Sequence, residues 1–206
     1  MPEPGRPRVG ILISGRGSNM VALVAAMQDG RVAADPAIVV ANAPGAAGLA
    51  TAAGFGIETA VVDHTRVSPR AAHERAVIEL LKTHRVDIVC LAGYMRRLSP
   101  LMVATFPGRI LNVHPALLPA FPGLDAQKAA LDHGVKVSGC TVHLVDDEVD
   151  HGPIVLQSAV PLEDGDTVET LSARILEQEH LIYPKALALL AEGRIELDGR
   201  RVRLRP

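Results

Sequence analysis

The stretch Val9-Gly-Ile-Leu-Ile-Ser-Gly-Arg-Gly-Ser-Asn19 joins a short apolar run to a glycine-rich turn and the start of a helix-like segment. Apolar side chains then recur with the spacing of one helical face, at Met20, Leu23, Val24 and Met27. A strand that passes through glycines into a helix is the repeating unit of α/β domains. This stretch therefore predicts the fold class, and the rest of the first half repeats its pattern.

Further strand-like runs follow at 38–41, 59–63 and 87–91, and helix-like segments lie between them at 46–53 and from Ser68-Pro69 to about His84. These strands are continuously apolar rather than alternating, which is typical of a parallel sheet with helices on both faces. The first half is therefore predicted to be a Rossmann-like, doubly wound, mostly parallel α/β sheet.

The second half predicts a mixed sheet. A strand at 110–114 leads into a proline-rich stretch, and strands at 137–145 and 154–160 are joined by an acidic loop. Helices are expected from Ser99, over 124–133, and from about Thr167. For the last of these we expect a capping box of Asp166 and Glu169 and a kink or restart at Pro184. The tail 195–204 predicts a hairpin turning at Asp198-Gly199.

Composition excludes several classes of protein. The 206 residues allow one large domain or two small ones, and no linker or repeat divides them. A net charge of −2 and an aromatic content of 2% argue against a nucleic-acid binder. The chain has no signal-peptide core and no apolar run of the roughly 18 residues that a membrane span needs. Cys90 and Cys140 lie in apolar runs, so we expect buried thiols in a reducing cytoplasm.

The glycine-rich segment Ser14-Gly-Arg-Gly-Ser-Asn19 favours an anion site. Its glycines let the backbone approach a ligand, and the following helix offers free N–H groups and a positive dipole end to a phosphate. A dinucleotide fingerprint would need glycine at Met20 and an acidic residue near Asn42, where the second strand ends. We therefore interpret the segment as a phosphate site without a dinucleotide, with a purely structural turn as the alternative.

Two polar segments could carry chemistry. Alternation places Asn112 and His114 on one face of a strand end, where amide and imidazole could both donate to a developing oxyanion. A satisfied polar pair is the alternative. The acidic loop before Gly152-Pro153 could be a solvated turn, but the rigid Gly-Pro directly after Asp150-His151 could also hold the Asp150 carboxylate inward. The histidines show no metal-ligand spacing, so no metal is expected.

Four segments together resemble the folate-dependent formyltransferases. They are Gly15-Arg-Gly-Ser-Asn19, Leu91-Ala-Gly-Tyr-Met-Arg96 with Leu98-Ser-Pro100, Asn112-Val-His-Pro-Ala-Leu-Leu-Pro119 with Phe121-Pro-Gly123, and Asp150-His-Gly-Pro153. The resemblance runs from about Val9 to about Glu192 and is greatest to the branch that acts on glycinamide ribonucleotide. It implies an enzyme of purine biosynthesis that transfers the formyl group of 10-formyltetrahydrofolate to the amine of that ribonucleotide. It also implies a single formyltransferase domain over 1–206, with the ribonucleotide bound by about 1–100, and with folate binding and catalysis in about 101–206.

The resemblance also implies roles for individual residues. The catalytic trio would be Asn112, His114 and Asp150. The substrate phosphate and ribose would be held by Gly15, Arg16, Gly17, Ser18, Asn19 and Glu179. The folate would contact Arg70, Met95, Arg96, Arg97, Leu98, Asn112, Val145, Asp146, Asp147, Glu148, Val149 and Asp150. Because Asp150 carries the opposite charge, we expect it to raise the pKa of His114, which would donate to the oxyanion as an imidazolium.

Rival functions are weighed by the same residues. A formyltetrahydrofolate deformylase would carry a further N-terminal domain. A methionyl-tRNA formyltransferase would carry a basic C-terminal domain. We expect neither enzyme, because 206 residues leave no room for a second domain. Met20 and Asn42 disfavour a nicotinamide-dependent oxidoreductase, and the trio disfavours a non-catalytic nucleotide-binding module.

The chain departs from the family pattern at Arg16, Ala116, Gln127 and Leu176. We expect small-molecule partners only, neither nucleic acid nor membrane, for a monomer or homodimer.

Overall fold

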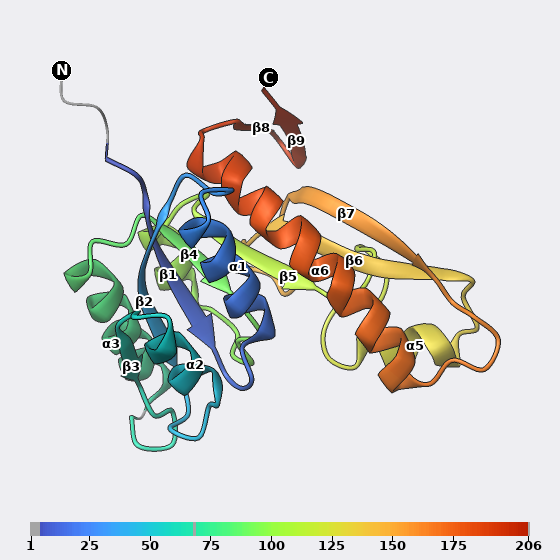
Figure 1. The fold of residues 1–206 in the computed structure, drawn as a ribbon, viewed down its shortest axis with the longest axis horizontal. Helices are drawn as coiled ribbons and strands as arrows, with labels where there is room; N and C mark the ends of the chain where they lie inside the picture. Colours follow the sequence, from blue (N-terminus) through green and yellow to red (C-terminus); the bar gives the residue numbers. More distant parts are fainter. Residues whose placement is uncertain (1–4, 68, 206) are drawn as a thin grey trace.

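A seven-stranded sheet forms the centre of the computed structural model, which describes residues 5–67 and 69–205 (Figure 1). The strand order is β3-β2-β1-β4-β5-β6-β7. The parallel part comprises β1 (Arg8–Ile13), β2 (Asp35–Ala41), β3 (Thr59–Val61), β4 (Ile88–Leu91) and β5 (Ile110–His114). The antiparallel part adds β6 (Val137–Leu144) and β7 (Ile154–Pro161). The expected α/β sheet, mostly parallel and mixed in its second half, is confirmed.

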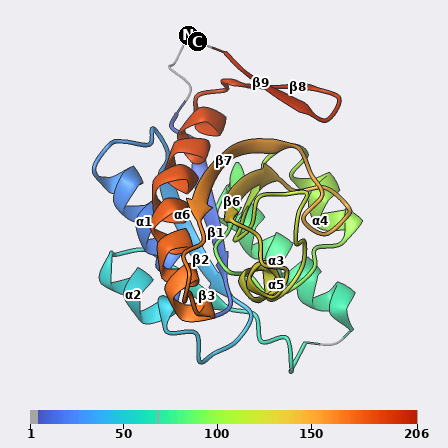
Figure 2. The ribbon, with the colours of Figure 1, turned by 90° about the vertical axis from the view of Figure 1, so that its right-hand side faces the viewer.

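Helices cover both faces of the sheet (Figure 2). One face packs against α1 (Ser18–Gln28), α2 (Gly48–Gly54) and α6 (Val168–Ala191), and the other against α3 (Arg70–Thr83) and α4 (Pro100–Thr105). The short helix α5 (Ala126–Asp132) packs against α6. Ile11 and Ile13 of β1 lie in the first core and Leu12 in the second. This two-sided burial explains why the strand is apolar at every position.

The expected capping box of α6 is wrong. The capping box is made by Thr167 and Thr170, which exchange side-chain to backbone hydrogen bonds, whereas Asp166 pairs with Arg174 at 2.5 Å. Thr167 has the extended backbone of an N-cap, which puts its own hydroxyl in reach of the first turn. The helix is continuous through Pro184 and does not restart there. Ser68, the expected cap of α3, lies outside the described residues.

The expected C-terminal hairpin and the expected buried cysteines are confirmed. The tail forms a hairpin of β8 (Ile195–Asp198) and β9 (Arg201–Leu204), with Gly199 in the turn at φ 59°. Cys90 and Cys140 are buried free thiols, and burial raises the pKa of each to about 12. No helix in the described part of the chain is long and apolar enough to cross a membrane.

The strand order reverses direction between β1 and β4, at the edge where ligands bind in open α/β sheets. The loops that follow these two strands are joined by hydrogen bonds. The Ser14 N–H donates to the Gly93 carbonyl at 3.2 Å, and the Met95 N–H donates to Ser14 Oγ at 2.8 Å. The glycine-rich loop after β1 and the loop after β4 therefore form one continuous rim.

Candidate active site

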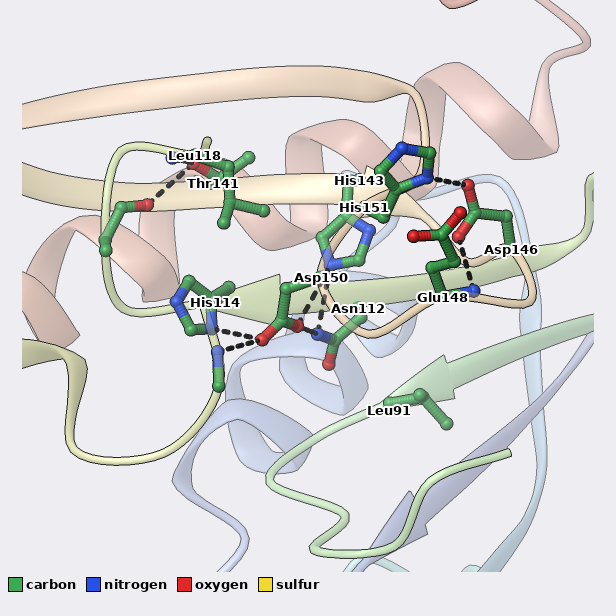
Figure 3. A network of polar contacts seen from close by, with 12 residues as sticks. Leu91, Asn112, His114, Leu118, Thr141, His143, Asp146, Glu148, Asp150 and His151 are labelled. Carbon is green, nitrogen blue, oxygen red and sulfur yellow. Dashed lines mark hydrogen bonds and ion pairs between the residues drawn. The ribbon is translucent and has the colours of Figure 1, made fainter. Parts of the chain in front are cut away.

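The structure brings Asn112, His114 and Asp150 together (Figure 3). Asn112 and His114 come from β5, and Asp150 comes from the loop between β6 and β7. Asp150 Oδ2 lies 3.2 Å from His114 Nδ1, and Asp150 Oδ1 accepts from Asn112 Nδ2 at 3.4 Å. The side chains of His114 and Asp150 are only 5% and 11% exposed. The acidic loop is therefore not simply a solvated turn, because one of its carboxylates faces inward.

The Asp150 carboxylate is held from several sides. Its backbone has φ 51°, a left-handed conformation that turns the side chain toward β5, and the Gly123 N–H donates to Oδ2 at 2.8 Å. Burial by itself would raise the pKa of Asp150. The neighbouring rings of His143 and His114 and the Gly123 N–H together outweigh burial and lower the pKa. Asp150 is therefore a carboxylate at neutral pH.

His114 contradicts one expectation. Its Nε2 donates to the Phe121 carbonyl at 2.7 Å, and its ring is enclosed by protein. Burial lowers its pKa, and the opposing effects of Asp150 and the Phe121 carbonyl are smaller. The expectation of a raised pKa is therefore wrong, because it counted the charge of Asp150 but not the loss of water around the ring. Burial therefore favours the neutral ring, and in that form the single proton is on Nε2, because the Phe121 carbonyl can only accept, while Nδ1 beside Asp150 carries a lone pair.

His143 completes this network, although sequence reasoning did not select it. It lies opposite Asn112 in the antiparallel register of β5 and β6. Its Nδ1 donates to the Leu144 carbonyl at 2.9 Å, which leaves Nε2 free to accept from Asn112 Nδ2 at 3.1 Å. The same Nε2 is 3.7 Å from Asp150 Oδ1. The available signal was a polar residue in an apolar strand, but its position depends on the strand register.

A cleft of about 630 Å³ opens beside this network. Its wall includes every residue expected to contact folate except Arg70, namely Met95, Arg96, Arg97, Leu98, Asn112, Val145, Asp146, Asp147, Glu148, Val149 and Asp150. Residues that were not expected also line it, among them Gly123, Leu124, Asp125 and Gln127. Arg70 lies in a smaller hollow next to the cleft, where its guanidinium donates to the Arg97 carbonyl. It therefore supports the wall rather than forming it.

Backbone strain is concentrated around the cleft. Four non-glycine residues in the described chain have positive φ, and three of them, Phe121, Asp125 and Asp150, lie on the two loops that meet at His114. Such conformations cost about 1–2 kcal/mol each and persist only where the surroundings enforce them. The loops are therefore held in a defined shape by their contacts with one another.

The glycine-rich loop forms a second site on the same edge. Gly17 precedes α1 at φ 74°, and a Cβ there would lie 3.3 Å from Gly48 Cα, so the turn needs glycine. Gly15 and Arg16 are exposed, while Ser18 begins the helix and presents its N–H groups. Asn19 Nδ2 donates to Glu179 Oε2 at 2.6 Å, which joins α1 to α6. Burial raises the pKa of Glu179, with Asn19 opposing it.

Comparisons with known proteins agree on one family. The formyl transferase family model matches residues 7–187. The chain is 39% identical to phosphoribosylglycinamide formyltransferase of Escherichia coli (strain K12), over 93% of this chain and 94% of that protein. It is 48% identical to the trifunctional purine biosynthetic protein adenosine-3 of Bos taurus, over 95% of this chain but only 19% of that longer relative.

A solved structure agrees as well. The crystal structure of glycinamide ribonucleotide transformylase 1 from Symbiobacterium toebii has a TM-score of 0.96 and 50% sequence identity, and the match covers 98% of this chain and 95% of that one. The mostly parallel sheet with helices on both faces is thus the fold of these relatives. The matched residues, 7–187, contain the glycine-rich loop, the cleft and all three members of the trio, and the chain belongs to the formyl transferase family.

Proposed function

We propose that the protein transfers the formyl group of 10-formyltetrahydrofolate to the amine of glycinamide ribonucleotide in purine biosynthesis, giving the N-formyl ribonucleotide and tetrahydrofolate. The observation that carries this proposal is the set of a half-buried amide, a buried imidazole and a half-buried carboxylate on the wall of a cleft. The names of its relatives support the same reaction. Both substrates belong to cytoplasmic metabolism, which favours that compartment.

The cleft suits the folate. A volume of about 630 Å³ is within the usual range for a drug-sized ligand. Met95, Leu98 and Val149 offer apolar contacts to the rings, and the backbone of 145–150 offers hydrogen bonds. Arg96 and Arg97 supply positive charge for the glutamate carboxylates. When bound, the folate supplies the formyl group that is transferred.

The glycine-rich loop suits the ribonucleotide. The exposed backbone of Gly15 and Arg16, the backbone of Gly17 and the first N–H groups of α1 would hold its phosphate. Glu179, fixed by Asn19, would accept hydrogen bonds from ribose hydroxyls. The Ser14–Gly93 hydrogen bond makes the phosphate loop and the folate cleft neighbours, so the amine can reach the formyl carbon. We therefore propose one catalytic domain, with the ribonucleotide bound mainly by about 1–100 and folate mainly by about 101–206.

The reaction needs an oxyanion stabilised and a proton moved. The amine nitrogen attacks the formyl carbon, and the carbonyl oxygen becomes negative. Asn112 uses one amide hydrogen on His143 at 3.1 Å and the other, more weakly, on Asp150 at 3.4 Å. The amide hydrogen on the longer contact with Asp150 is the one that can turn to the oxyanion instead. Asn112 therefore acts as a donor that His143 keeps in place.

His114 acts first as a base. Burial favours the neutral ring, in which Nδ1 is free, so Nδ1 can accept the proton that the attacking amine loses, directly or through water. Asp150, ionised 3.2 Å away, stabilises the imidazolium that forms. The imidazolium then donates to the oxyanion and returns the proton to the departing folate nitrogen as the carbon–nitrogen bond breaks. All these groups come from one chain, so a monomer contains a complete site and a homodimer would contain two.

Incubation with both substrates tests the proposal. We expect tetrahydrofolate to form from 10-formyltetrahydrofolate only when glycinamide ribonucleotide is present, with equimolar formylated ribonucleotide by mass spectrometry. Product without the ribonucleotide would mean transfer to water. The absence of any product in a folded, ligand-binding sample would favour a binding module and contradict the proposal.

A further inference from the structure

The loop between β6 and β7 has contacts on its outer side as well as in the cleft. The inner side carries Asp150, and the next residue, His151, points outward to the C-terminal hairpin. Arg200, in the turn of that hairpin, donates through Nη2 to the His151 carbonyl at 2.5 Å. Its Nη1 lies 2.8 Å from His151 Nε2 and 3.1 Å from His151 Nδ1. One guanidinium thus contacts both the backbone and the ring of the residue that follows Asp150.

These contacts continue across the base of the loop. His151 Nδ1 lies 2.7 Å from Asp146 Oδ2, so that nitrogen carries the proton and donates to the carboxylate (Figure 3). Arg200 Nη1 lies close to both ring nitrogens, so the guanidinium sits against the face of the imidazole. The result is a chain of contacts from Arg200 through His151 to Asp146. It links the last part of the loop to its first part and to the hairpin.

The backbone of the loop explains why outside support matters. Asp150 has φ 51°, a conformation that an aspartate leaves readily when its contacts are lost. On its other side Gly152 is packed so tightly that a Cβ would lie 1.8 Å from the Leu144 carbonyl oxygen, and the Leu144 N–H donates to the Pro153 carbonyl at 2.9 Å. The base of the loop is therefore fixed at 152–153, while His151 holds the strained residue next to it.

The hairpin itself is anchored. Its strand β9 contacts β7, and the Arg205 N–H donates to the Arg194 carbonyl at 2.9 Å, at the end of α6. We propose that Arg200 is a positioning residue for the proposed reaction: through His151 it holds the loop 145–150 from outside, so that Asp150 faces His114 and the loop keeps the shape that folate contacts. The inference rests on the proposed function for its kinetic part but not for its structural part.

The test compares Arg200→Ala with Arg201→Ala. Both remove one charge from the exposed hairpin turn, but within residues 5–67 and 69–205 the Arg201 side chain has no hydrogen bond or ion pair. Hydrogen exchange of peptides covering 145–152 reports the loop directly. In Arg200→Ala we expect exchange there to rise about threefold to tenfold, the effect of losing one or two ordinary hydrogen bonds, and in Arg201→Ala to stay at the wild-type rate.

Kinetics supply the second readout. Arg200→Ala should raise KM for 10-formyltetrahydrofolate by about threefold to tenfold and leave KM for the ribonucleotide unchanged, because the glycine-rich loop is not touched. Arg200→Lys keeps the charge but not the paired donors and should give a smaller rise. Unchanged loop exchange in Arg200→Ala, or an equal rise in both KM values, would overturn the proposal. If the wild type shows no transfer, the proposed function fails, and the exchange measurement still decides the role of Arg200.

Discussion

Asp150 and Glu179 are both buried carboxylates that accept a hydrogen bond from an asparagine amide, yet their pKa values move in opposite directions. Around Glu179, the Asn19 amide is the one hydrogen-bond donor among the described residues, and burial raises the pKa. Asp150 has in addition the Gly123 N–H and two neighbouring imidazoles, and these lower its pKa despite burial. The number of polar partners around each carboxyl group therefore decides which one stays ionised.

This difference matches the two proposed tasks. An ionised Asp150 can stabilise a positive charge on His114 at the moment of reaction, before any ligand has changed its surroundings. Glu179 lacks donors until the ribonucleotide arrives, and ribose hydroxyls would supply them. Binding of that substrate should therefore shift the pKa of Glu179 back toward its ordinary value, whereas Asp150 needs no such help.

The largest loss of turnover is expected when the groups around Asp150 are removed. Asn112→Ala and His114→Ala should each lower kcat by about 10²–10³, as the loss of an oxyanion donor does. The measurement is single-turnover formyl transfer at saturating substrates. Gln28→Ala, which removes an exposed amide on α1, is the control and should be unaffected. Near-normal turnover in both variants would remove these residues from the mechanism.

Asp150→Asn tests the charge itself. Turnover should fall by about 10²-fold, because the imidazolium that forms on His114 loses its counter-charge. The pKa of His114, already below its ordinary value, should fall further, since Asp150 is the largest effect opposing burial. A titration of the histidine NMR signals, with His114→Ala to assign the resonance, would measure this. A His114 signal that titrates at the same pH in wild type and variant would argue against the pairing.

Glu179→Gln should have a smaller effect on activity. KM for the ribonucleotide should rise about tenfold with kcat nearly unchanged, because a hydrogen bond from a hydroxyl to a carboxylate becomes a neutral one. Glu177→Gln, two residues earlier and exposed on α6, is the matched control. An unchanged KM would place the ribose elsewhere.

Stability against pH should also separate the two carboxylates. The folded pKa of Glu179 lies above 4.5, so wild-type stability falls as pH rises from 4.5 through that pKa, and Glu179→Gln escapes this loss. The folded pKa of Asp150 lies below 3.8, so its contribution is present above 3.8 and is lost as pH falls through the folded value. Urea unfolding of the variants across pH 3–8 would give both signs. A parallel response of the two variants would contradict the assigned directions.

The smallest expected effect concerns the N-cap of α6, the helix that carries Glu179. Thr167→Ala removes the N-cap of α6 and should lower the free energy of unfolding by about 1 kcal/mol. Activity at 25 °C should hardly change, because Glu179 lies three turns further along a helix fixed by its buried face. Thr83→Ala, an exposed threonine at the end of α3, serves as the comparison in thermal or urea unfolding.

Much of this architecture could be predicted because it depends on residues that are close in the chain. Apolar runs followed by glycines gave nearly the observed strand bounds, and the alternation at Asn112 and His114 gave two side chains that line one cleft. The capping box of α6 was misplaced by one residue, because Asp166 and Thr167 are both good caps and only the backbone shows which one is extended.

The sequence by itself determined the α/β class, the glycine-rich turn and the segments of the trio, since these follow from local spacing and residue chemistry. Only the tertiary structure decided that His143 lies opposite Asn112, that Asn19 reaches Glu179 across 160 positions, and that Arg200 contacts the loop of Asp150. It also decided the direction of the His114 pKa. Register, long-range contact and loss of water are properties of the packed molecule, and no stretch of neighbouring residues contains them.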